Sequence, residues 1–441
     1  MISIPSIALA ASLLLLGAPP ARPATDCGAH SAGLLGALQK GHYSAATTGF
    51  DSRLTAALDS DKLRQIWQDL LPAQFGPFQQ AHAATSSHAN GMTVITTPLQ
   101  FANGWLDMQV ACNADGSVGG LFFKPGHAPS TVAPAATARV GHDVALTTPS
   151  PLGDLPGTLT LPNGDGPFPA VLLVAGSGPQ DRDETIGPNK PLRDIADALA
   201  GHGIASYRYD KRSRVYGAAM AGKPITVDDE VTADAVTAAK RLAQQPHIDS
   251  RRVFVLGHSL GALMAPRIAS RDPALAGVIL VSAPTALSLD VVLRQLRYLG
   301  QLAHTPASAL AAELAPVIAA RDVLAKADPA KPPVGQFFHA PASYWLSLRD
   351  YQPIALMQKL PQPVLILQGG SDYQVTPSDD FARWRDALAD DARATLKLYP
   401  GLSHLMMPAG DPPSPADYQR PGHVDATVLA DLVAWIKQHS T

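Results

Sequence analysis

From residue 140 onward, short apolar runs of strand length alternate with longer segments that carry apolar residues at helical spacing. Four of the runs are continuously apolar, which is typical of parallel strands buried on both faces. They are "FPAVLLVAG" (168–176), "RVFVLGHS" (252–259), "GVILVSAP" (277–284) and "PVLILQGGSD" (363–372). Segments of helical periodicity follow or separate them, at 191–203, 228–245, 261–270, 378–390 and 424–439. This alternation predicts a parallel sheet covered by helices on both faces.

The first part of the chain has a different pattern. Residues 32–50 and 59–76 carry apolar positions at helical spacing, and three β-rich segments separated by Asn-Gly and Asp-Gly turn signals follow up to residue 125. We therefore predict a small α+β domain over 28–125, an Ala- and Pro-rich linker over 126–139 and an α/β domain over 140–441.

A helical stretch at about 285–350 interrupts the strand–helix alternation of the larger domain. An insertion at this point of the sheet lies over the carboxyl ends of the strands, where ligands bind in such folds. We expect a cap over the site, and the alternative is a packing insertion with no role in access.

Residues 1–24 combine an apolar stretch from Ile7 to Leu16 with small residues and prolines. The length suits a signal peptide and is short for a membrane span, although no Lys or Arg precedes the apolar run. Cleavage after Ala18, Ala21 or Ala24 would leave an exported protein, periplasmic or extracellular, without a stable membrane anchor. An uncleaved anchor or a plain N-terminal helix is the alternative.

Two cysteines, Cys27 and Cys112, remain after such cleavage. In an oxidising compartment they could pair as a disulfide, and two unlinked thiols are the alternative. The net charge of −3 and a charged fraction of 16% give no sign of a nucleic-acid partner. No Walker loop or zinc motif occurs, so we expect no cofactor and no metal. The oligomeric state stays open.

The strand at 252–257 runs into a polar segment, Gly257-His258-Ser259-Leu260-Gly261, and an apolar helix follows it. A serine needs a base in contact and an unobstructed position to attack a carbonyl, and a tight turn from strand to helix supplies that position. The two glycines let strand and helix approach closely. We predict Ser259 as a nucleophile, with a plain helix N-cap as the alternative.

In the fold that carries this turn, the acid comes next along the chain and the histidine last. Asp372 lies just beyond one buried strand, and His404 lies in a loop beyond the next one. We predict His404 as the base and Asp372 as the acid that orients it. His258 is expected to be structural, because successive residues of a strand point to opposite sides.

A tetrahedral intermediate needs two backbone N–H donors. We predict one at Leu260, directly after the nucleophile, and the other at Ser177 or Gly178 in the loop after "FPAVLLVAG". Asp210 and Arg212, at the end of another strand, are expected to form a structural ion pair, and contact with the substrate is the alternative.

The segments "GSGPQDRDETIGPNKPLRDIADALAGHGIASYRYDKRS", "GHSLGALMAPRIA", "LILQGGSDYQV" and "YPGLSHLM" resemble exported bacterial α/β-hydrolase esterases, which are similar to serine aminopeptidases and dienelactone hydrolases. The resemblance covers about 140–441, and the first domain resembles a cystatin-like or nuclear-transport-factor-like accessory domain. It implies an α/β-hydrolase fold, Ser259, Asp372 and His404 as a catalytic triad, and short-acyl esters as substrates.

We therefore expect a serine carboxylic-ester hydrolase that acts through an acyl-enzyme on small-molecule esters of short to medium chain length. One alternative is an aminopeptidase or amidase on the same scaffold, with Asp181, Asp183 or Glu184 holding the substrate amine. A binding protein built on a hydrolase fold is the other.

Overall fold

The computed structural model describes residues 27–89, 92–102, 104–125 and 141–440. The chain forms two compact units, residues 1–130 and 131–441, and each is described by itself. The predicted signal peptide (1–24) and linker (126–139) lie outside the described residues.

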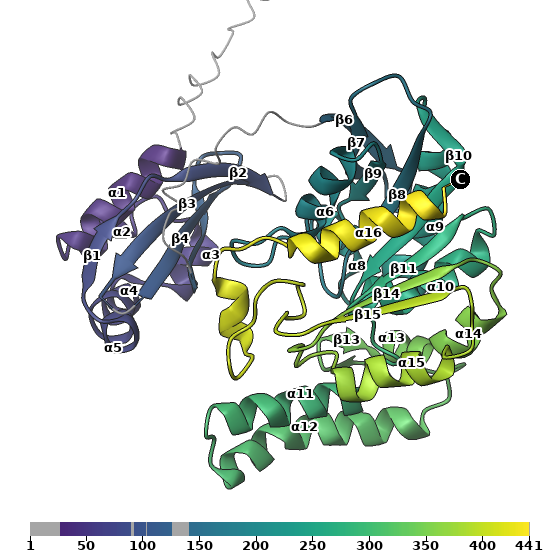
Figure 1. Ribbon diagram of the computed structural model, residues 1–441. Coiled ribbons are helices and arrows are strands. Elements are labelled where there is room, and N and C mark those ends of the chain that lie inside the picture. The colour runs from purple at the N-terminus through teal and green to yellow at the C-terminus, as the bar shows by residue number, and fades with distance from the viewer. Residues whose placement is uncertain (1–26, 90–91, 103, 126–140, 441) are drawn as a thin grey trace, which may run out of the picture. The chain divides into compact units, whose positions relative to one another are not determined.

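The first unit packs short helices against an antiparallel sheet of order β1-β3-β4-β5, and β2 also pairs with β3 (Figure 1). The strands are β1 (Phe78–Ala81), β2 (Thr85–Ala89), β3 (Met92–Phe101), β4 (Gly104–Cys112) and β5 (Val118–Pro125). The helices are α1 (Cys27–Gln39), α2 (Tyr43–Ala46), α3 (Ser52–Ala57), α4 (Ser60–Gln65), the π-helical turn η1 (Ile66–Leu70) and α5 (Leu71–Phe75). The sequence pattern indicates β3, β4 and β5 but not the short β1 and β2, which have few apolar residues.

A disulfide joins Cys27, the first residue of α1, to Cys112, the last residue of β4. Both cysteines are buried in the same apolar cluster as Leu99 and Met108. The bridge closes a loop with a sequence separation of 85, so it ties the helical layer to the middle of the sheet.

The second unit contains an eight-stranded sheet of order β15-β14-β11-β10-β8-β9-β7-β6. Strand β7 is antiparallel to both of its neighbours, and the pairs from β9 to β15 are parallel. The strands are β6 (Gly141–Thr148), β7 (Leu155–Pro162), β8 (Phe168–Val174), β9 (Ala205–Tyr209), β10 (Ile248–His258), β11 (Gly277–Val281), β14 (Val364–Gly369) and β15 (Ala394–Tyr399).

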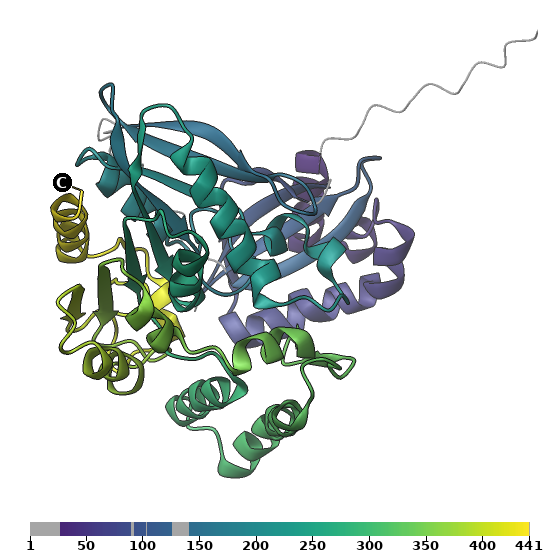
Figure 2. The same cartoon turned by 90° about the vertical axis from the view of Figure 1, so that its right-hand side faces the viewer.

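Helices cover both faces of this sheet, as Figures 1 and 2 show. Helices α9 (Ala233–Ala243) and α10 (Leu260–Arg271) share one apolar cluster, and α6 (Pro191–Ala200) and α16 (Ala426–Gln438) share the other. Strand β10 explains this arrangement, because Val253 and Val255 belong to the first cluster and Phe254 and Leu256 to the second. A continuous apolar run supplies both faces, as the sequence predicts.

Smaller elements complete this unit. They are α7 (Arg212–Val215), α8 (Gly217–Met220), the π-helical turns η2 (Asp228–Thr232) and η3 (Pro377–Phe381), α14 (Pro353–Lys359), α15 (Ala382–Ala387) and the 3-10 helix η4 (Pro415–Gln419).

The segment between β11 and β14 holds two long helices, α11 (Leu289–Leu302) and α12 (Ala307–Lys326), which lie side by side (Figure 1). It also contains a small hairpin, β12 (Gln336–Phe337) and β13 (Ala340–Pro341), followed by α13 (Ala342–Arg349). The sequence pattern indicates only helices here. The hairpin turn is formed by Phe338 and His339, both with positive φ, and these residue types give no turn signal.

We predict that the double substitution Cys27→Ser, Cys112→Ser destabilises the first unit by about 2–5 kcal/mol, because the long loop regains its conformational freedom in the unfolded state. Thermal unfolding followed by calorimetry measures the shift, and reduced wild-type protein is the matched comparison. The transition of the larger unit should not move. An unchanged first-unit transition in both samples would contradict the prediction.

Candidate active site

Ser259 lies in a sharp turn between β10 and α10, with φ 53° and ψ −116°. A Cβ atom at Gly257 would lie 2.2 Å from the carbonyl carbon of Gly261, and one at Gly261 would lie 2.2 Å from the carbonyl oxygen of Val174. Both positions therefore require glycine for the close approach of helix and strand. The backbone N–H of Ser259 donates to the carbonyl of Val281 at 3.0 Å, which fixes the turn on the neighbouring strand.

The structure brings His404 and Asp372 into direct contact. His404 Nδ1 lies 2.7 Å from Asp372 Oδ2, and the two residues are 4% and 3% exposed. Asp372 Oδ1 accepts the backbone N–H groups of Gln374 and Val375 at 2.9 and 3.0 Å. The Gln368 side chain donates to Oδ2 at 3.2 Å. These donors fix the orientation in which the carboxylate faces the imidazole.

The backbone carbonyl of His404 is held from two sides. Ser282 Oγ donates to it at 2.9 Å, and His258 Nε2 lies 2.9 Å from it. The rings of His258 and His404 are 4.8 Å apart between centroids. Because His258 directly precedes Ser259, the histidine loop and the serine turn meet at the same edge of the sheet.

A cavity of about 470 Å³ opens at this edge, and Ser259, Leu260, Ser177 and Gly178 all line it. The four residues come from the turn after β10 and the loop after β8, as the sequence predicts for a nucleophile and its oxyanion donors. Opposite walls come from the insertion, with side chains from α11, the β12–β13 hairpin and α13. They are Val291, Val292, Gln295, Phe338, His339, Ala340, Pro341, Tyr344 and Trp345.

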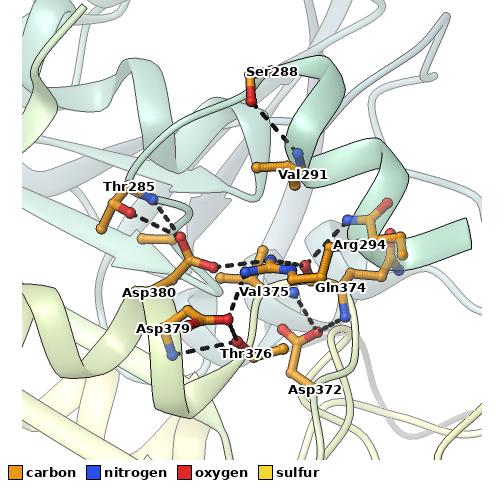
Figure 3. Close-up of polar contacts among 12 residues, drawn as sticks. Thr285, Ser288, Val291, Arg294, Asp372, Gln374, Val375, Thr376, Asp379 and Asp380 are labelled. Atoms are coloured by element: carbon orange, nitrogen blue, oxygen red, sulfur yellow. Dashed lines mark hydrogen bonds and ion pairs between the residues drawn. The ribbon is translucent and has the colours of Figure 1, made fainter. Parts of the chain in front are cut away.

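Side chains of α11 form hydrogen bonds with the loop that carries Asp372, as Figure 3 shows. The Arg294 guanidinium donates to Asp379 Oδ2 at 2.8 Å and to the carbonyl of Gln374 at 3.0 Å. The Gln295 side chain donates to the same carbonyl at 3.1 Å. Two consecutive residues of the insertion thus hold a carbonyl that lies two positions from Asp372.

Each carboxylate considered as an anchor for a substrate amine already has a hydrogen-bond or ion-pair partner in the protein. Asp183 pairs with Arg208 at 2.9 Å, and Asp181 accepts the backbone N–H groups of Asp183 and Thr185. Glu184 is 1% exposed and lies 2.8 Å from His258 Nδ1.

The prediction that Asp210 and Arg212 form an ion pair with each other is wrong. Asp210 accepts both the side chain of Arg182, at 2.7 Å, and its backbone N–H at 2.8 Å. Arg212 instead pairs with the buried Asp234 of α9. Each side chain has a partner from another segment, so proximity in sequence does not predict the pairing.

The contact between Glu184 and His258 is the feature of the site that the sequence does not reveal. The two residues are 74 positions apart, and no local pattern links them. Burial by itself lowers the pKa of His258, but the Glu184 carboxylate and the hydrogen bonds to Glu184 and to the His404 carbonyl raise it above its ordinary value.

Two searches of the described part of the chain gave negative results. It contains no group of three or more His, Cys, Asp or Glu side chains placed to hold a metal ion. Among its helices, none has the length and apolarity needed to cross a membrane.

The strand order, the turn at Ser259 and the contact between His404 and Asp372 define an α/β-hydrolase. A family model described as "Serine aminopeptidase, S33" matches residues 190–411. The protein belongs to this hydrolase family.

Esterase EstD of Thermotoga maritima is 34% identical over 401 residues, which cover 90% of this chain and 92% of the relative. Among solved structures, Est1E from Butyrivibrio proteoclasticus is 16% identical with a TM-score of 0.40, covering 67% of this chain and 96% of that one. A Pyrococcus furiosus esterase is 13% identical with a TM-score of 0.44, covering 71% and 95%.

We predict that Gly261→Ala destabilises the second unit by about 1–3 kcal/mol or more, because the added methyl group meets the backbone of Val174 and no side chain can move aside. Chemical denaturation measures the loss. Gly217→Ala is the matched comparison, because Gly217 lies in a helix, has no positive φ and has open space around the position of a Cβ. Equal losses in the two variants would contradict the role of close approach.

Proposed function

We propose that the protein is a serine carboxylic-ester hydrolase that forms an acyl-enzyme at Ser259. The observation that carries this proposal is the convergence at one sheet edge of a serine in a strained turn, a buried histidine–aspartate pair and two backbone segments that line the same cavity. A serine esterase needs a nucleophile, a base with its orienting acid, and an oxyanion site.

In the reaction, Ser259 Oγ attacks the ester carbonyl and His404 Nε2 takes its proton. The contact between His404 Nδ1 and Asp372 fixes the tautomer that leaves Nε2 free to act as the base. The imidazolium then protonates the leaving alcohol, and the acyl-enzyme forms. A water molecule, activated by the same imidazole, releases the carboxylic acid and restores Ser259.

Backbone N–H donors stabilise the negative charge on the oxygen of the tetrahedral intermediate. The N–H of Leu260 is the first of α10, and its helix N-terminus favours an anion. The second donor comes from Ser177 or Gly178; Gly178 has φ +86°, a backbone conformation suited to glycine.

Electrostatics at the cavity favour a neutral ester over a substrate with a free amine. Of the described residues that line the cavity, one carries a carboxylate, Glu230, and Lys211 lies 2.9 Å from it. The similarity to Esterase EstD supports the same substrate class. Aminopeptidase activity would require an acidic group placed to bind the amine, and none of the candidates Asp181, Asp183 and Glu184 is among the described residues that line the cavity.

The size of the cavity supports esters of short to medium chain length. Its volume of about 470 Å³ lies in the lower half of the range for small-molecule pockets, roughly 300–1,000 Å³. A second cavity of about 530 Å³ adjoins it, and Ala286, Leu287 and Trp345 line both. We assign to Trp345, the largest of the three, the role of limiting the length of the bound chain.

We also propose that the protein is exported. The apolar pattern of residues 7–24 supports this proposal, and so does the disulfide between Cys27 and Cys112, because disulfides persist in oxidising compartments.

We predict that Ser259→Ala removes nearly all turnover of p-nitrophenyl butyrate, a loss of at least about 10³-fold, while unfolding is unchanged. Labelling by a fluorophosphonate should disappear with the activity. A parallel assay with an amino-acid p-nitroanilide should give a clearly lower wild-type rate than the ester. Full activity of the Ser259→Ala protein, or faster hydrolysis of the anilide, would overturn the assignment.

We predict that Trp345→Ala joins the two cavities and raises kcat/KM for a p-nitrophenyl ester of a long acyl chain about tenfold relative to that for the acetate. Trp345→Phe is the matched control, because it keeps most of the bulk but loses the hydrogen bond from Nε1 to the Phe337 carbonyl. A chain-length profile that is the same in all three proteins would contradict the prediction.

A further inference from the structure

Glu184 and His258 form a buried pair beside the catalytic residues, and neither takes part in the proposed proton transfers. Glu184 is 1% exposed and His258 is 3% exposed. Nδ1 of the imidazole lies 2.8 Å from Glu184 Oε1, and Nε2 lies 2.9 Å from the carbonyl oxygen of His404. The ring therefore bridges a carboxylate and the backbone of the catalytic base.

The partners of the ring determine where its protons lie. A carbonyl oxygen can only accept, so Nε2 carries a hydrogen and donates it to His404. The other nitrogen faces Glu184 Oε1, which also accepts the backbone N–H of Gly176 at 2.7 Å. A doubly protonated ring donates to both neighbours, and the carboxylate balances its charge. The raised pKa of His258 agrees with this state.

The pair makes contact with three parts of the site. Glu184 holds the N–H of Gly176, the residue before Ser177 in the oxyanion loop. His258 is the residue before the nucleophile, and its ring holds the backbone of His404. Each point of attachment is thus at or directly beside a group that the reaction uses.

The packing around Gly176 shows how closely these parts meet. A Cβ atom at Gly176 would lie 2.7 Å from Glu184 Oε1 and 3.2 Å from Ser259 Cβ. The carbonyl of the same glycine accepts from Lys211 Nζ at 2.8 Å. The Gly176 peptide is therefore held at its N–H by a carboxylate and at its carbonyl by an ammonium group.

We propose that Glu184 and His258 are positioning residues, which hold the oxyanion loop, the serine turn and the backbone of His404 at the spacing that acyl transfer requires. The inference rests on the proposed esterase function. Misplacement of reacting groups by about 1 Å costs on the order of 100-fold in rate. The insertion supplies the opposite walls of the cavity, and among the described hydrogen bonds neither residue of the pair is bonded to it. The pair should therefore affect kcat much more than KM.

The variant Glu184→Gln tests the proposal with almost no change in volume. A glutamine cannot balance an imidazolium, so His258 becomes neutral and keeps one N–H. With Nε2–H on the His404 carbonyl, Nδ1 becomes an acceptor. The amide at position 184 can then turn its NH2 group to Nδ1, which leaves the Gly176 N–H without an acceptor, or keep its oxygen on that N–H and face the lone pair of Nδ1, so one of the two contacts of Glu184 Oε1 is lost. We expect kcat for p-nitrophenyl butyrate to fall by about 10- to 100-fold, with KM changed by no more than about twofold.

Asp234→Asn is the matched control. It breaks the buried ion pair with Arg212, and neither residue lines the cavity. The variant should be destabilised in the same way but keep the wild-type kcat below its unfolding temperature. If Asp234→Asn loses kcat as Glu184→Gln does, the effect is one of stability and the proposal is overturned.

A second variant decides the matter if Glu184→Gln does not fold. His258→Gln places an amide nitrogen near the position of Nε2, so it can keep the bond to the His404 carbonyl but cannot reach Glu184 in the same way. We expect the same loss of kcat at nearly constant KM. Wild-type kcat in a folded Glu184→Gln or His258→Gln protein would overturn the proposal while leaving the esterase function intact. An inactive wild-type enzyme that fluorophosphonate does not label would overturn the function itself.

Discussion

The active site depends on one buried carbonyl oxygen, that of His404. The histidine lies in a loop after the last strand of the sheet, and loops are ordinarily the most variable part of a fold. Here Ser282, after β11, and His258, at the end of β10, both hold this oxygen at 2.9 Å. His404, the proposed base, is thereby fixed to β10 and to the residue after β11, and its ring contacts Asp372.

The buried charges of the second unit are compensated in pairs. Glu184 faces His258, Lys211 faces Glu230, and Arg212 faces Asp234, all largely buried. An isolated charge in such a place would be costly, whereas pairs that also satisfy backbone groups can be kept. Two of these pairs hold Gly176, since Glu184 Oε1 accepts its N–H and Lys211 Nζ donates to its carbonyl, so the loop that carries the proposed oxyanion donors lies among fixed dipoles.

The sequence predicts those parts of the fold whose signals are local. Apolar runs reveal the strands β8, β10, β11 and β14, and Asp372 and His404 follow from their places after β14 and β15. Pairings between distant segments are not predictable in this way. Asp210 and Arg212 are close in sequence but bind Arg182 and Asp234, and nothing in the chain marks Glu184 as the partner of His258. The hairpin at 336–341 escapes prediction because Phe338 and His339 occupy positions that usually hold glycine or asparagine.

The insertion contacts both the cavity and the loop that carries Asp372. Its side chains line one wall of the cavity, while Arg294 and Gln295 of the same helix hold the carbonyl of Gln374. The backbone N–H of Gln374 in turn donates to Asp372, so a single peptide segment connects the cavity wall to the proposed triad. A shift of α11 that enlarged the cavity would displace the backbone N–H groups that donate to the Asp372 carboxylate. The side of the cavity formed by the hairpin and Trp345 has no such bond to the acid loop among the described contacts, so it is the side on which substrate preference can change without disturbing the triad.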